Sequence, residues 1–538
     1  MSEAILGKLP RGWEIAPLGT IAGEPVDQFG PTGRDTFVYV DIGSVDNETK
    51  RITEPKRLKV IAAPSRARQN LRRGDVLVSM TRPNLNAVAI VGDAFDGALG
   101  STGFRVLRAS AMEPSWLFHA VQTREFVSSM CTLVQGALYP AVRPKDIDAW
   151  LCPVPPLEEQ RRITDALDEL LSDLDAGVVA LERVRTKLKL FRASVLKAAV
   201  EGALTAEWRA QHPDTEPAAV LLQRILVERR SRWEESQLEK FKAACKVLPK
   251  DWKAKYDERM SANTTSLSTL PNGWCWASLD QLAVDGAIGL DRGMQYQRMV
   301  PPGSPYIKMN NVTMDGRVLF DDLVYVEPTS EEGQRYSLCD GDLLFNTRNS
   351  KELVGKVGIV LQPPANAVYN NNLMRLRFDG AALPAFVCYQ MCAGEFRGRM
   401  EKVKKATTSV AAVYAKDLFP LALALAPLAE QAAIVEAVED QISVVDHLEA
   451  DIDAKLKSAQ ALRQSILRDA FAGKLVPQDP TDEPASVLLT RIAAEREERA
   501  QLAASVRSAG RKAKPAKATK TTTPRKRAAT KKQAKGTR

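Results

Sequence analysis

The sequence predicts an α+β protein with two globular α/β domains, separated by two long helices that pair as an antiparallel coiled coil. Three observations predict this fold class. An internal repeat covers most of the 538 residues, one long segment of each copy spaces its apolar residues by three and four, and β-rich runs punctuated by Gly, Pro and Asn fill the remainder. The repeat predicts a pseudo-twofold arrangement of the two halves.

The repeat is visible in short motifs and in a long stretch of constant spacing. From Lys145 the two copies are offset by 271 positions, and this offset holds as far as Gly202 and its copy Gly473. Earlier in each copy the offset drifts, which indicates loops of variable length. The repeated motifs are LPRGW at 9–13 and LPNGW at 270–274, GDVL at 74–77 and GDLL at 341–344, and Thr81-Arg82 with Thr347-Arg348.

Constant and drifting offsets divide the chain into segments. β-rich runs such as Phe37–Val40, Val76–Val78 and Val357–Leu361 place the globular domains in the drifting parts. The predicted segments are a first globular domain at 1–156, a long helix at 157–204, a helical connector at 205–260, a second globular domain at 261–427, a second long helix at 428–475, a C-terminal helix at 476–506 and a basic tail at 507–538.

The two long helices are predicted from apolar periodicity and from their ends. Proline leads each helix, at Pro155-Pro156 and at Pro427, and glycine follows each, at Gly202 and Gly473. At 1.5 Å per residue such a helix is roughly 65 Å long, and its apolar stripe needs a partner. We expect the two helices to pack on each other; the alternative is that each folds back onto its own domain. Gly177 predicts a slight bend in the first helix.

The net charge of +9 is concentrated in the tail. Residues 507–538 contain 13 Lys and Arg and no Asp or Glu, so the rest of the chain has a net charge of −4. This Lys-, Ala- and Thr-rich segment has no aromatic residue and little to bury, and is predicted to be disordered. It favours sequence-independent contact with DNA phosphates; the alternative is a solubilising tail.

The sequence argues against several classes of function. Seven scattered cysteines and three histidines predict neither a disulfide framework nor a zinc site, and Cys388 and Cys392 are expected to pack in a core. We find no membrane span and no secretory signal, so the chain is expected in the cytoplasm. The sequence also lacks the usual catalytic motifs: phosphate-binding loops, Gly-rich cofactor turns, HExxH and the Asn/Asp-Pro-Pro-aromatic signature of adenine methyltransferases. No catalysis is therefore expected.

Two homologous domains on a twofold scaffold suit DNA, whose local dyad presents two half-sites. The motifs PPLEEQRRI (155–163) and APLAEQAAI (426–434), together with VLKAAVEGALT (195–205) and ILRDAFAGKLV (466–476), resemble the specificity subunits of Type I restriction-modification enzymes. The resemblance extends over nearly the whole chain up to about residue 500. The basic tail is outside it.

The resemblance implies a non-catalytic DNA-recognition subunit. Each globular domain would be a target recognition domain that reads one half of a bipartite asymmetric site, while the helices set the spacing and dock two modification subunits. The chain would bind no cofactor; S-adenosylmethionine, ATP and Mg would be bound by the modification and restriction subunits. The alternatives are an enzyme that cuts or methylates DNA by itself, and an architectural DNA-binding scaffold that reads no sequence.

Base edges are read by Arg or Lys toward guanine and by Asn or Gln toward adenine, with about 1 to 3 kcal/mol for each good pair. Loops rich in these residues are the candidates, although Asn and Ser also favour turns. Recurrence of Thr-Arg in both copies indicates phosphate positioning or a structural role. The candidates are Arg82, Asn84, Asn86, Ser101, Thr102 and Arg105 in the first domain, Arg348, Asn349, Lys351, Asn370, Asn371 and Asn372 in the second, and Tyr139, Arg143, Tyr414 and Lys416 before the helices.

Other repeated residues suggest packing or docking. Trp13 and Trp274 are expected to anchor a core. Docking of the modification subunits is assigned to four residues at the starts of the helices, for which a solvated face is the alternative: Glu159, Gln160, Glu430 and Gln431. The shorter amphipathic segments Thr215–Glu235 and Asp482–Arg499 either extend this docking surface or pack beside the coiled coil.

Overall fold

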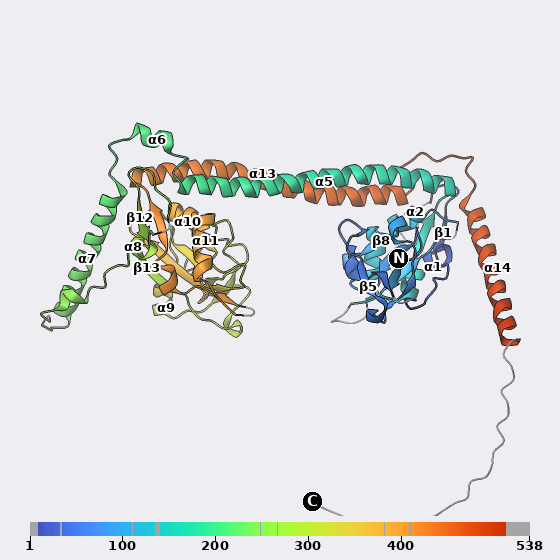
Figure 1. Cartoon of the computed structure of the whole chain (residues 1–538), viewed down its shortest axis with the longest axis horizontal. Coiled ribbons are helices and arrows are strands. Elements are labelled where there is room, and N and C mark those ends of the chain that lie inside the picture. Colours follow the sequence, from blue (N-terminus) through green and yellow to red (C-terminus); the bar gives the residue numbers. More distant parts are fainter. Residues whose placement is uncertain are drawn as a thin grey trace, which may run out of the picture. The chain divides into compact units, whose positions relative to one another are not determined.

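A computed structural model of the chain describes residues 9–32, 35–109, 111–134, 140–247, 249–265, 267–380, 382–407 and 410–512 (Figure 1). Its contacts form two compact units. The first contains the described residues up to Val178 and those from Lys457 onward, and the second spans Val179–Leu456. Each unit therefore combines one globular α/β domain with a part of both long helices, and the predicted fold class is confirmed.

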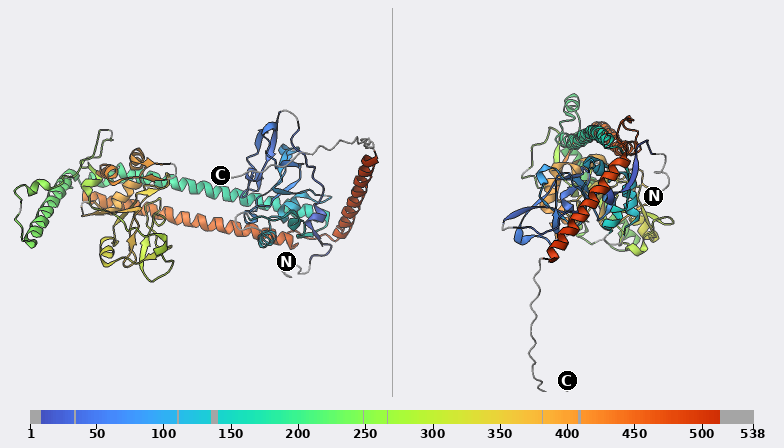
Figure 2. Two further views of the ribbon diagram at one scale, coloured as in Figure 1. Left: turned by 90° about the horizontal axis from the view of Figure 1, so that it is seen from below. Right: turned by 90° about the vertical axis from the view of Figure 1, so that its right-hand side faces the viewer.

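The long helices are α5 (Leu157–Val200) and α13 (Leu428–Phe471), which lie side by side (Figures 1 and 2). Each helix is four residues shorter at its C-terminal end than predicted. Gly202 and Gly473 take φ values of +69° and +66°, and a left-handed residue after the last turn ends a helix. The amide of Ala203 donates to the carbonyl oxygen of Ala198, which completes this turn (2.8 Å).

Each unit shows the two helices running antiparallel. In the first unit the N-terminal part of α5 shares a core with the C-terminal part of α13, through buried residues such as Leu167 and Leu467. In the second unit Val195 shares a core with Ile434 and Val438. Ion pairs link the helices at equivalent positions, Asp175 with Arg463 in the first unit and Asp446 with Arg192 in the second.

The globular domain of the first unit contains two main sheets, with strand orders β5-β2-β9-β6 and β10-β7-β8. The β2–β9 pair is parallel and the other pairs of these sheets are antiparallel. The short pair β1-β11 joins the domain to the start of α5. Its elements are β1 (Glu14–Pro17), α1 (Leu18–Ile21), β2 (Thr36–Val40), β3 (Val45–Asp46), β4 (Arg51–Ile52), β5 (Lys56–Lys59), β6 (Ala67–Asn70), β7 (Val76–Ser79), β8 (Val88–Ile90), β9 (Leu99–Ser101), β10 (Phe104–Leu107), α2 (Pro114–Ala120), α3 (Arg124–Thr132), α4 (Pro144–Asp148) and β11 (Leu151–Val154).

The second unit repeats most of this topology. Its sheet β15-β14-β19, with β14–β19 parallel, corresponds to β5-β2-β9 without a strand in the place of β6. Its sheet β13-β20-β16-β18 corresponds to β10-β7-β8 with β13 added, β17-β22-β21 forms a further small sheet, and β12-β23 precedes α13. The elements are β12 (Cys275–Ser278), α8 (Leu279–Leu282), β13 (Ala283–Ile288), β14 (Ser304–Ile307), β15 (Val324–Val326), α9 (Ser330–Arg335), β16 (Leu343–Asn346), β17 (Arg348–Asn349), β18 (Val357–Ile359), β19 (Val368–Tyr369), β20 (Leu373–Phe378), α10 (Pro384–Cys392), α11 (Gly394–Val403), β21 (Lys405–Ala406), β22 (Ala411–Ala412), α12 (Ala415–Leu418) and β23 (Ala422–Leu425).

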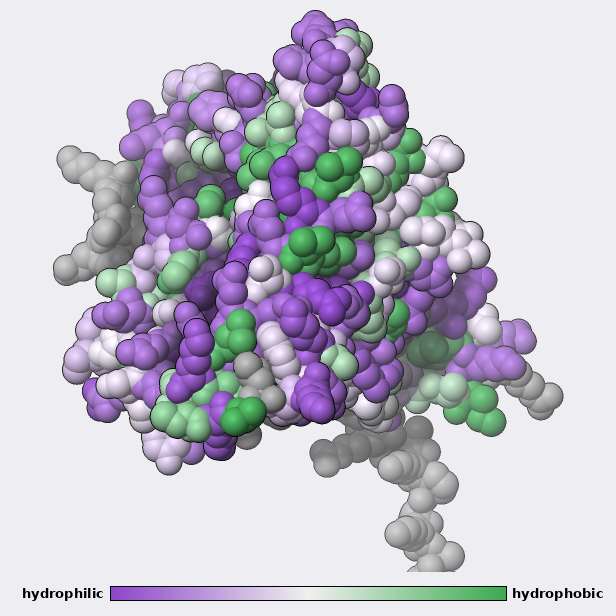
Figure 3. Space-filling model, turned by 90° about the vertical axis from the view of Figure 1, so that its left-hand side faces the viewer, coloured by the Kyte–Doolittle hydropathy of each residue, from purple (hydrophilic) through white to green (hydrophobic). Residues whose placement is uncertain are grey.

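Shorter helices follow each long helix: α6 (Ala206–Gln211) and α7 (Ala218–Ala243) after α5, and α14 (Ala485–Lys512) after α13. α14 runs six residues into the segment assigned to the tail, since Ala, Arg and Lys favour helix and the first proline beyond is Pro515. The rest of the tail lies outside the described residues. On the face of the second unit shown in Figure 3, hydrophobic residues lie as separate groups among hydrophilic ones.

Candidate nucleic-acid interface

The repeated Glu-Gln pairs and tryptophans form the joint between each domain and the helices. The Trp13 indole donates a hydrogen bond to the Glu159 carboxylate (2.9 Å), and the Trp274 indole donates to Glu430 (2.8 Å). Both tryptophans are buried, as predicted, and both carboxylates are at most 1% exposed. Burial raises the pKa of Glu159, an effect that the Trp13 hydrogen bond partly offsets.

The neighbouring glutamines tie α5 and α13 to the next helix of each domain. In the first unit, Gln160 accepts a hydrogen bond from the amide of Glu113, which precedes α2, and donates to the carbonyl oxygen of Pro155. In the second unit, Gln431 accepts from the amide of Leu383, which precedes α10, and donates to Ala426. Since all four side chains are buried, the docking role predicted for Glu159, Gln160, Glu430 and Gln431 is corrected: they hold the chain's own domains.

The first domain presents a polar loop directly after β7. Arg82 and Asn86 both have left-handed backbone conformations, with φ values of +48° and +47°, and a 3-10 turn (Pro83–Leu85) lies between them. The Arg82 and Asn84 side chains are exposed, and Asn86 is half-buried. The loop is anchored at both ends, because the Arg82 amide donates to the carbonyl oxygen of Pro140 (2.8 Å) and the carbonyl oxygen of Asn86 accepts from Lys50 (2.6 Å). Between these anchors it presents Arg82 and Asn84 at the surface.

The second predicted group of this domain is mostly structural. Ser101 is buried, and its hydroxyl accepts from the amide of Gly103. The Arg105 guanidinium forms an ion pair with Asp148 (2.7 Å) and donates to the carbonyl oxygen of Val106 (2.7 Å). Ser101 and Arg105 are thus corrected to packing and bridging roles, and only Thr102 is exposed.

The equivalent loop of the second domain has different chemistry. Arg348 and Lys351 are exposed, and Asn349 is half-buried. The side-chain amide nitrogen of Asn349 donates to the side-chain oxygen of Asn346, and its side-chain oxygen accepts from the backbone amide of Ser350. Asn349 and Arg348 form β17, which pairs with β22. The loop is therefore held by a short sheet rather than by left-handed residues.

The asparagine run after β19 lies partly inside the domain. Asn370 is 6% exposed, and its amide oxygen is buried without a partner among the described residues, so its predicted role at a base edge is corrected. Asn371 and Asn372 are half-buried, and the backbone carbonyl oxygen of Asn372 accepts hydrogen bonds from Asn346 and Thr347. The run chiefly supports the Arg348 loop.

The residues before the long helices remain at the surface. Arg143 forms an exposed ion pair with Asp146 (3.0 Å), and this pairing with the carboxylate raises the pKa of Arg143. Tyr414 is 48% exposed, with the Lys405 ammonium over its ring, and Lys416 is exposed. Tyr139 lies outside the described residues.

One exposed loop in each domain was not predicted from the sequence. Between β13 and β14, residues 292–303 expose the apolar side chains of Met294, Tyr296 and Met299 by 65 to 84%. The base of this loop is fixed, because Arg292 pairs with Glu332 (2.6 Å) and Arg298 with Glu327 (3.0 Å). The corresponding segment before β2 exposes Phe29. Gly and Pro flank both segments, at Gly293 and Pro301-Pro302-Gly303 and at Gly30-Pro31, and are the sequence signal for such a loop.

The described residues contain no group of three or more His, Cys, Asp or Glu side chains that could hold a metal ion. Within the same ranges, no helix is long and apolar enough to cross a membrane. All seven cysteines are free, and Cys388 and Cys392 are buried in the core of the second unit, as predicted.

Comparisons with known proteins agree with the repeat and the fold. No family model matches the sequence. The chain is 25% identical over 517 residues to the Type I restriction enzyme EcoKI specificity subunit of Escherichia coli K12, covering 91% of this chain and 97% of that protein. It is 23% identical over 524 residues to the StySPI specificity subunit of Salmonella potsdam, covering 91% and 96%.

A solved structure described as the structural basis of complex assembly and conformational transition of the type I R-M system has the same fold. Its TM-score is 0.61 at 24% identity, covering 87% of this chain and 99% of that one. The two sequence relatives match along almost their entire length. Along almost its whole length, the chain is therefore similar to the specificity subunits of Type I restriction enzymes.

Proposed function

We propose that this chain is the DNA-recognition subunit of a Type I restriction-modification complex, in which each globular domain reads one half of a bipartite, asymmetric target. One contrast supports the proposal. Both domains keep the same joint to the helices, Trp13 with Glu159 and Trp274 with Glu430, but their exposed loops differ. The same tryptophan–glutamate contact combined with different loops is what two readers of different half-sites need.

The loops supply the chemistry for this reading. Arg82 and Asn84 in the first domain and Arg348 and Lys351 in the second are exposed. Arg and Lys donate to guanine and Asn pairs with adenine in the major groove. The exposed apolar loop around Tyr296 is suited to contact base faces or thymine methyl groups. The helices would set the distance between the two half-sites.

A test of recognition is single-molecule sequencing of methylated adenine in cells that express this chain with its methyltransferase partner, compared with cells that lack this chain. The expected result is a split motif of two short blocks around a fixed gap that appears only with this chain. Replacing residues 270–427 by another such domain should change one block and leave the other. Methylation that is unchanged without the chain, although the partner is active and assembled, would refute recognition and favour an architectural scaffold.

We also propose two modification subunits as partners, one for each half of the repeat, with restriction subunits joining the complex in the cytoplasm. The chain itself would bind no cofactor; S-adenosylmethionine, ATP and Mg would be held by these subunits. A repeated feature on α7 and α14 supports two identical docking events. Val220 on α7 is 52% exposed beside the Arg224–Glu216 ion pair (2.7 Å), and its counterpart Val487 on α14 is 43% exposed beside Arg491–Glu483 (2.7 Å).

Native mass spectrometry of the assembled complex tests this docking. Val220→Asp and Val487→Asp should each remove one modification subunit, and the double variant should remove both, because a buried carboxylate at an apolar contact is costly. Leu502→Asp is the control, since Leu502 is exposed on α14 but has Glu235 at the matching position of α7. Full assembly of the double variant would exclude this face as the docking surface.

A further inference from the structure

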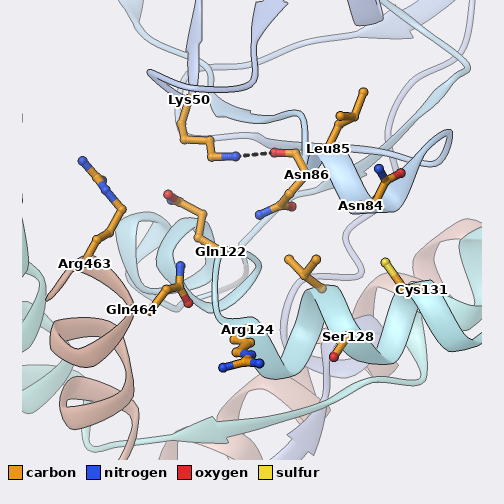
Figure 4. Close-up of a pocket in the computed structure, with 11 residues that line it drawn as sticks. Lys50, Asn84, Leu85, Asn86, Gln122, Arg124, Ser128, Cys131, Arg463 and Gln464 are labelled. Atoms are coloured by element: carbon orange, nitrogen blue, oxygen red, sulfur yellow. Dashed lines mark hydrogen bonds between the residues drawn. The ribbon is translucent and has the colours of Figure 1, made fainter. Parts of the chain in front are cut away.

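A cavity of about 450 Å³ in the first unit lies where four elements meet: the Arg82–Asn86 loop, the β3–β4 hairpin, α3 and α13. Figure 4 shows Lys50, Asn86 and Gln122 pointing toward its centre, with Arg124 and Arg463 at its wall. Lys50, Arg124 and Arg463 are cationic, and the described residues that line the cavity include no acidic one. A concave surface with charge of one sign attracts the opposite ion, here an anion.

Lys50 is held in position but is poorly compensated. It sits at the tip of the hairpin with a φ of +57°, and its ammonium donates a hydrogen bond to the carbonyl oxygen of Asn86 (2.6 Å). Burial lowers the pKa of Lys50 to about 8, and repulsion by Arg463 adds to this effect. Asp46, on the same hairpin, opposes the shift only weakly. A charged oxygen beside the ammonium would stabilise it much more than a neutral carbonyl does.

The equivalent place in the second unit is neutralised. Arg192, the counterpart of Arg463, pairs with Asp446, lies 3.2 Å from Glu449 and is 3.9 Å from Asp315. Gly316 occupies the hairpin-tip position of Lys50, again with a positive φ, and Gly394 occupies the position of Arg124. In the first unit the only ion pair that the structure gives Arg463 is with Asp175. The excess of positive charge is therefore a property of the first unit and not of the shared fold.

We propose that this cavity binds a phosphate oxyanion, and that this phosphate belongs to the DNA backbone beside the half-site read by the first domain. The inference rests on the proposed function. Asn84, Leu85 and Asn86 form one wall, and Arg82 begins the same loop, so a phosphate held by Lys50 fixes this loop in register with the bases. A free phosphate or nucleotide carries the same oxyanion, so the experiment distinguishes a DNA phosphate from a free one.

The test uses the full chain assembled with its methyltransferase partner and DNA that carries the motif found by methylation sequencing. Affinity is measured from about 50 to 200 mM salt for the wild type and for Lys50→Met. Loss of one phosphate contact should reduce the slope of log K against log salt by about 1, so the wild type loses about three- to fourfold more affinity over this range. Arg124→Gln, which changes an exposed side chain of the same cavity, should have the same effect.

Lys59→Met is the matched control, because Lys59 is an exposed lysine of the same domain outside the cavity and its loss changes the charge equally. Its slope should equal that of the wild type. The unfolding temperature of Lys50→Met should not fall, since a partly desolvated charge is removed. If the unfolding temperature of Lys50→Met does fall, the salt dependence of Arg124→Gln alone decides whether the cavity contacts a phosphate.

Two results would overturn the inference, and a third would refute the proposed function on which it rests. Equal slopes for the wild type, Lys50→Met and Arg124→Gln, or an equal decrease for Lys59→Met, would exclude a phosphate contact in the cavity. Equal slopes combined with stabilisation of the wild type, but not of Lys50→Met, by inorganic phosphate would identify a free anion as the ligand. Wild-type complex that does not prefer the motif would instead refute the proposed recognition function itself.

Discussion

The two buried glutamates at the domain joints give a paired prediction about stability. Glu430 accepts hydrogen bonds from Trp274 (2.8 Å), Thr205 (2.8 Å) and the Arg209 guanidinium (2.7 Å), and the Arg209 side chain is 23% exposed. Glu430→Gln removes the charge that faces Arg209. Breaking a buried ion pair costs about 3 to 5 kcal/mol, and the partial exposure of Arg209 places the loss in the free energy of unfolding near 3 kcal/mol.

Glu159 has the same tryptophan contact without such a pair. Its carboxylate accepts from Trp13, its other oxygen is buried without a hydrogen-bond partner among the described residues, and Arg162 forms its ion pair with Asp482 (2.6 Å) instead. A glutamine keeps the acceptor for Trp13 and carries no charge. Glu159→Gln should therefore cost no more than about 1 kcal/mol, since one neutral hydrogen bond changes little.

Differential scanning calorimetry of the full chain checks the difference of about 2 kcal/mol, which corresponds to roughly 4 to 8 °C for domains of this size. Glu430→Gln should lower the transition of the second unit, and Glu159→Gln should leave the first almost unchanged. Thr205→Val, which removes one neutral donor to Glu430, serves as the control of intermediate size. Equal losses for the two glutamine variants, or a larger loss for Glu159→Gln, would refute the charge-pairing argument.

Three further predictions follow from single residues. A Cβ at Gly473 would lie 2.3 Å from Cγ of Pro10 at a φ of +66°, whereas a Cβ at Gly177 meets nothing. Gly473→Ala should therefore lower the free energy of unfolding by at least about 2 kcal/mol, and Gly177→Ala should raise it by about 0.5 to 1 kcal/mol. Thermal unfolding measures both changes. Tyr296→Ala should weaken binding of motif DNA by about 1 kcal/mol or more without lowering the unfolding temperature; unchanged affinity would exclude its loop from the interface. The folded-state pKa of Lys50, about 8, lies below its ordinary value of 10.5. Deprotonation of Lys50 should therefore weaken DNA binding as pH rises from 7 to 9, and Lys50→Met should lack this pH-dependent loss of affinity. The other titratable groups around Lys50 are Arg463, Arg124, Cys131 and Asp46.

The long helices could be predicted from the sequence because their determinants are local. Apolar residues at spacings of three and four define the buried stripe, and Pro156 and Gly202 mark the ends of α5. The roles of Glu159 and Gln160 could not be predicted in this way. In the first turn of a helix, an acidic and an amide side chain normally face water, and their partners Trp13 and Glu113 are far away in the sequence. Only the fold brings these groups together.

The recognition residues were harder to predict for a related reason. Polar residues in and after strands include Arg82 and Arg348, which are exposed, but also Ser101, Arg105 and Asn370, which the fold uses internally. The loop around Tyr296 gives no such polar signal, because exposed Met and Tyr resemble core residues in a sequence. Exposed candidates are separated from internally used residues by their burial, which depends on the tertiary structure.

Comparing the two halves of the chain sharpens this distinction. What both halves retain, such as the tryptophan–glutamate joints and the Asp175–Arg463 and Asp446–Arg192 pairs, belongs to the scaffold, because both domains need the same attachment whatever they read. Residues that differ at matching positions are not required by the scaffold and are available for target recognition. Lys50 beside a loop with two left-handed residues is such a difference, because the other half has Gly316 there and a second carboxylate, Glu449, beside its arginine. The repeated motifs are thus structural, and under the proposed function the residues that determine the target would be among those at which one half departs from the other.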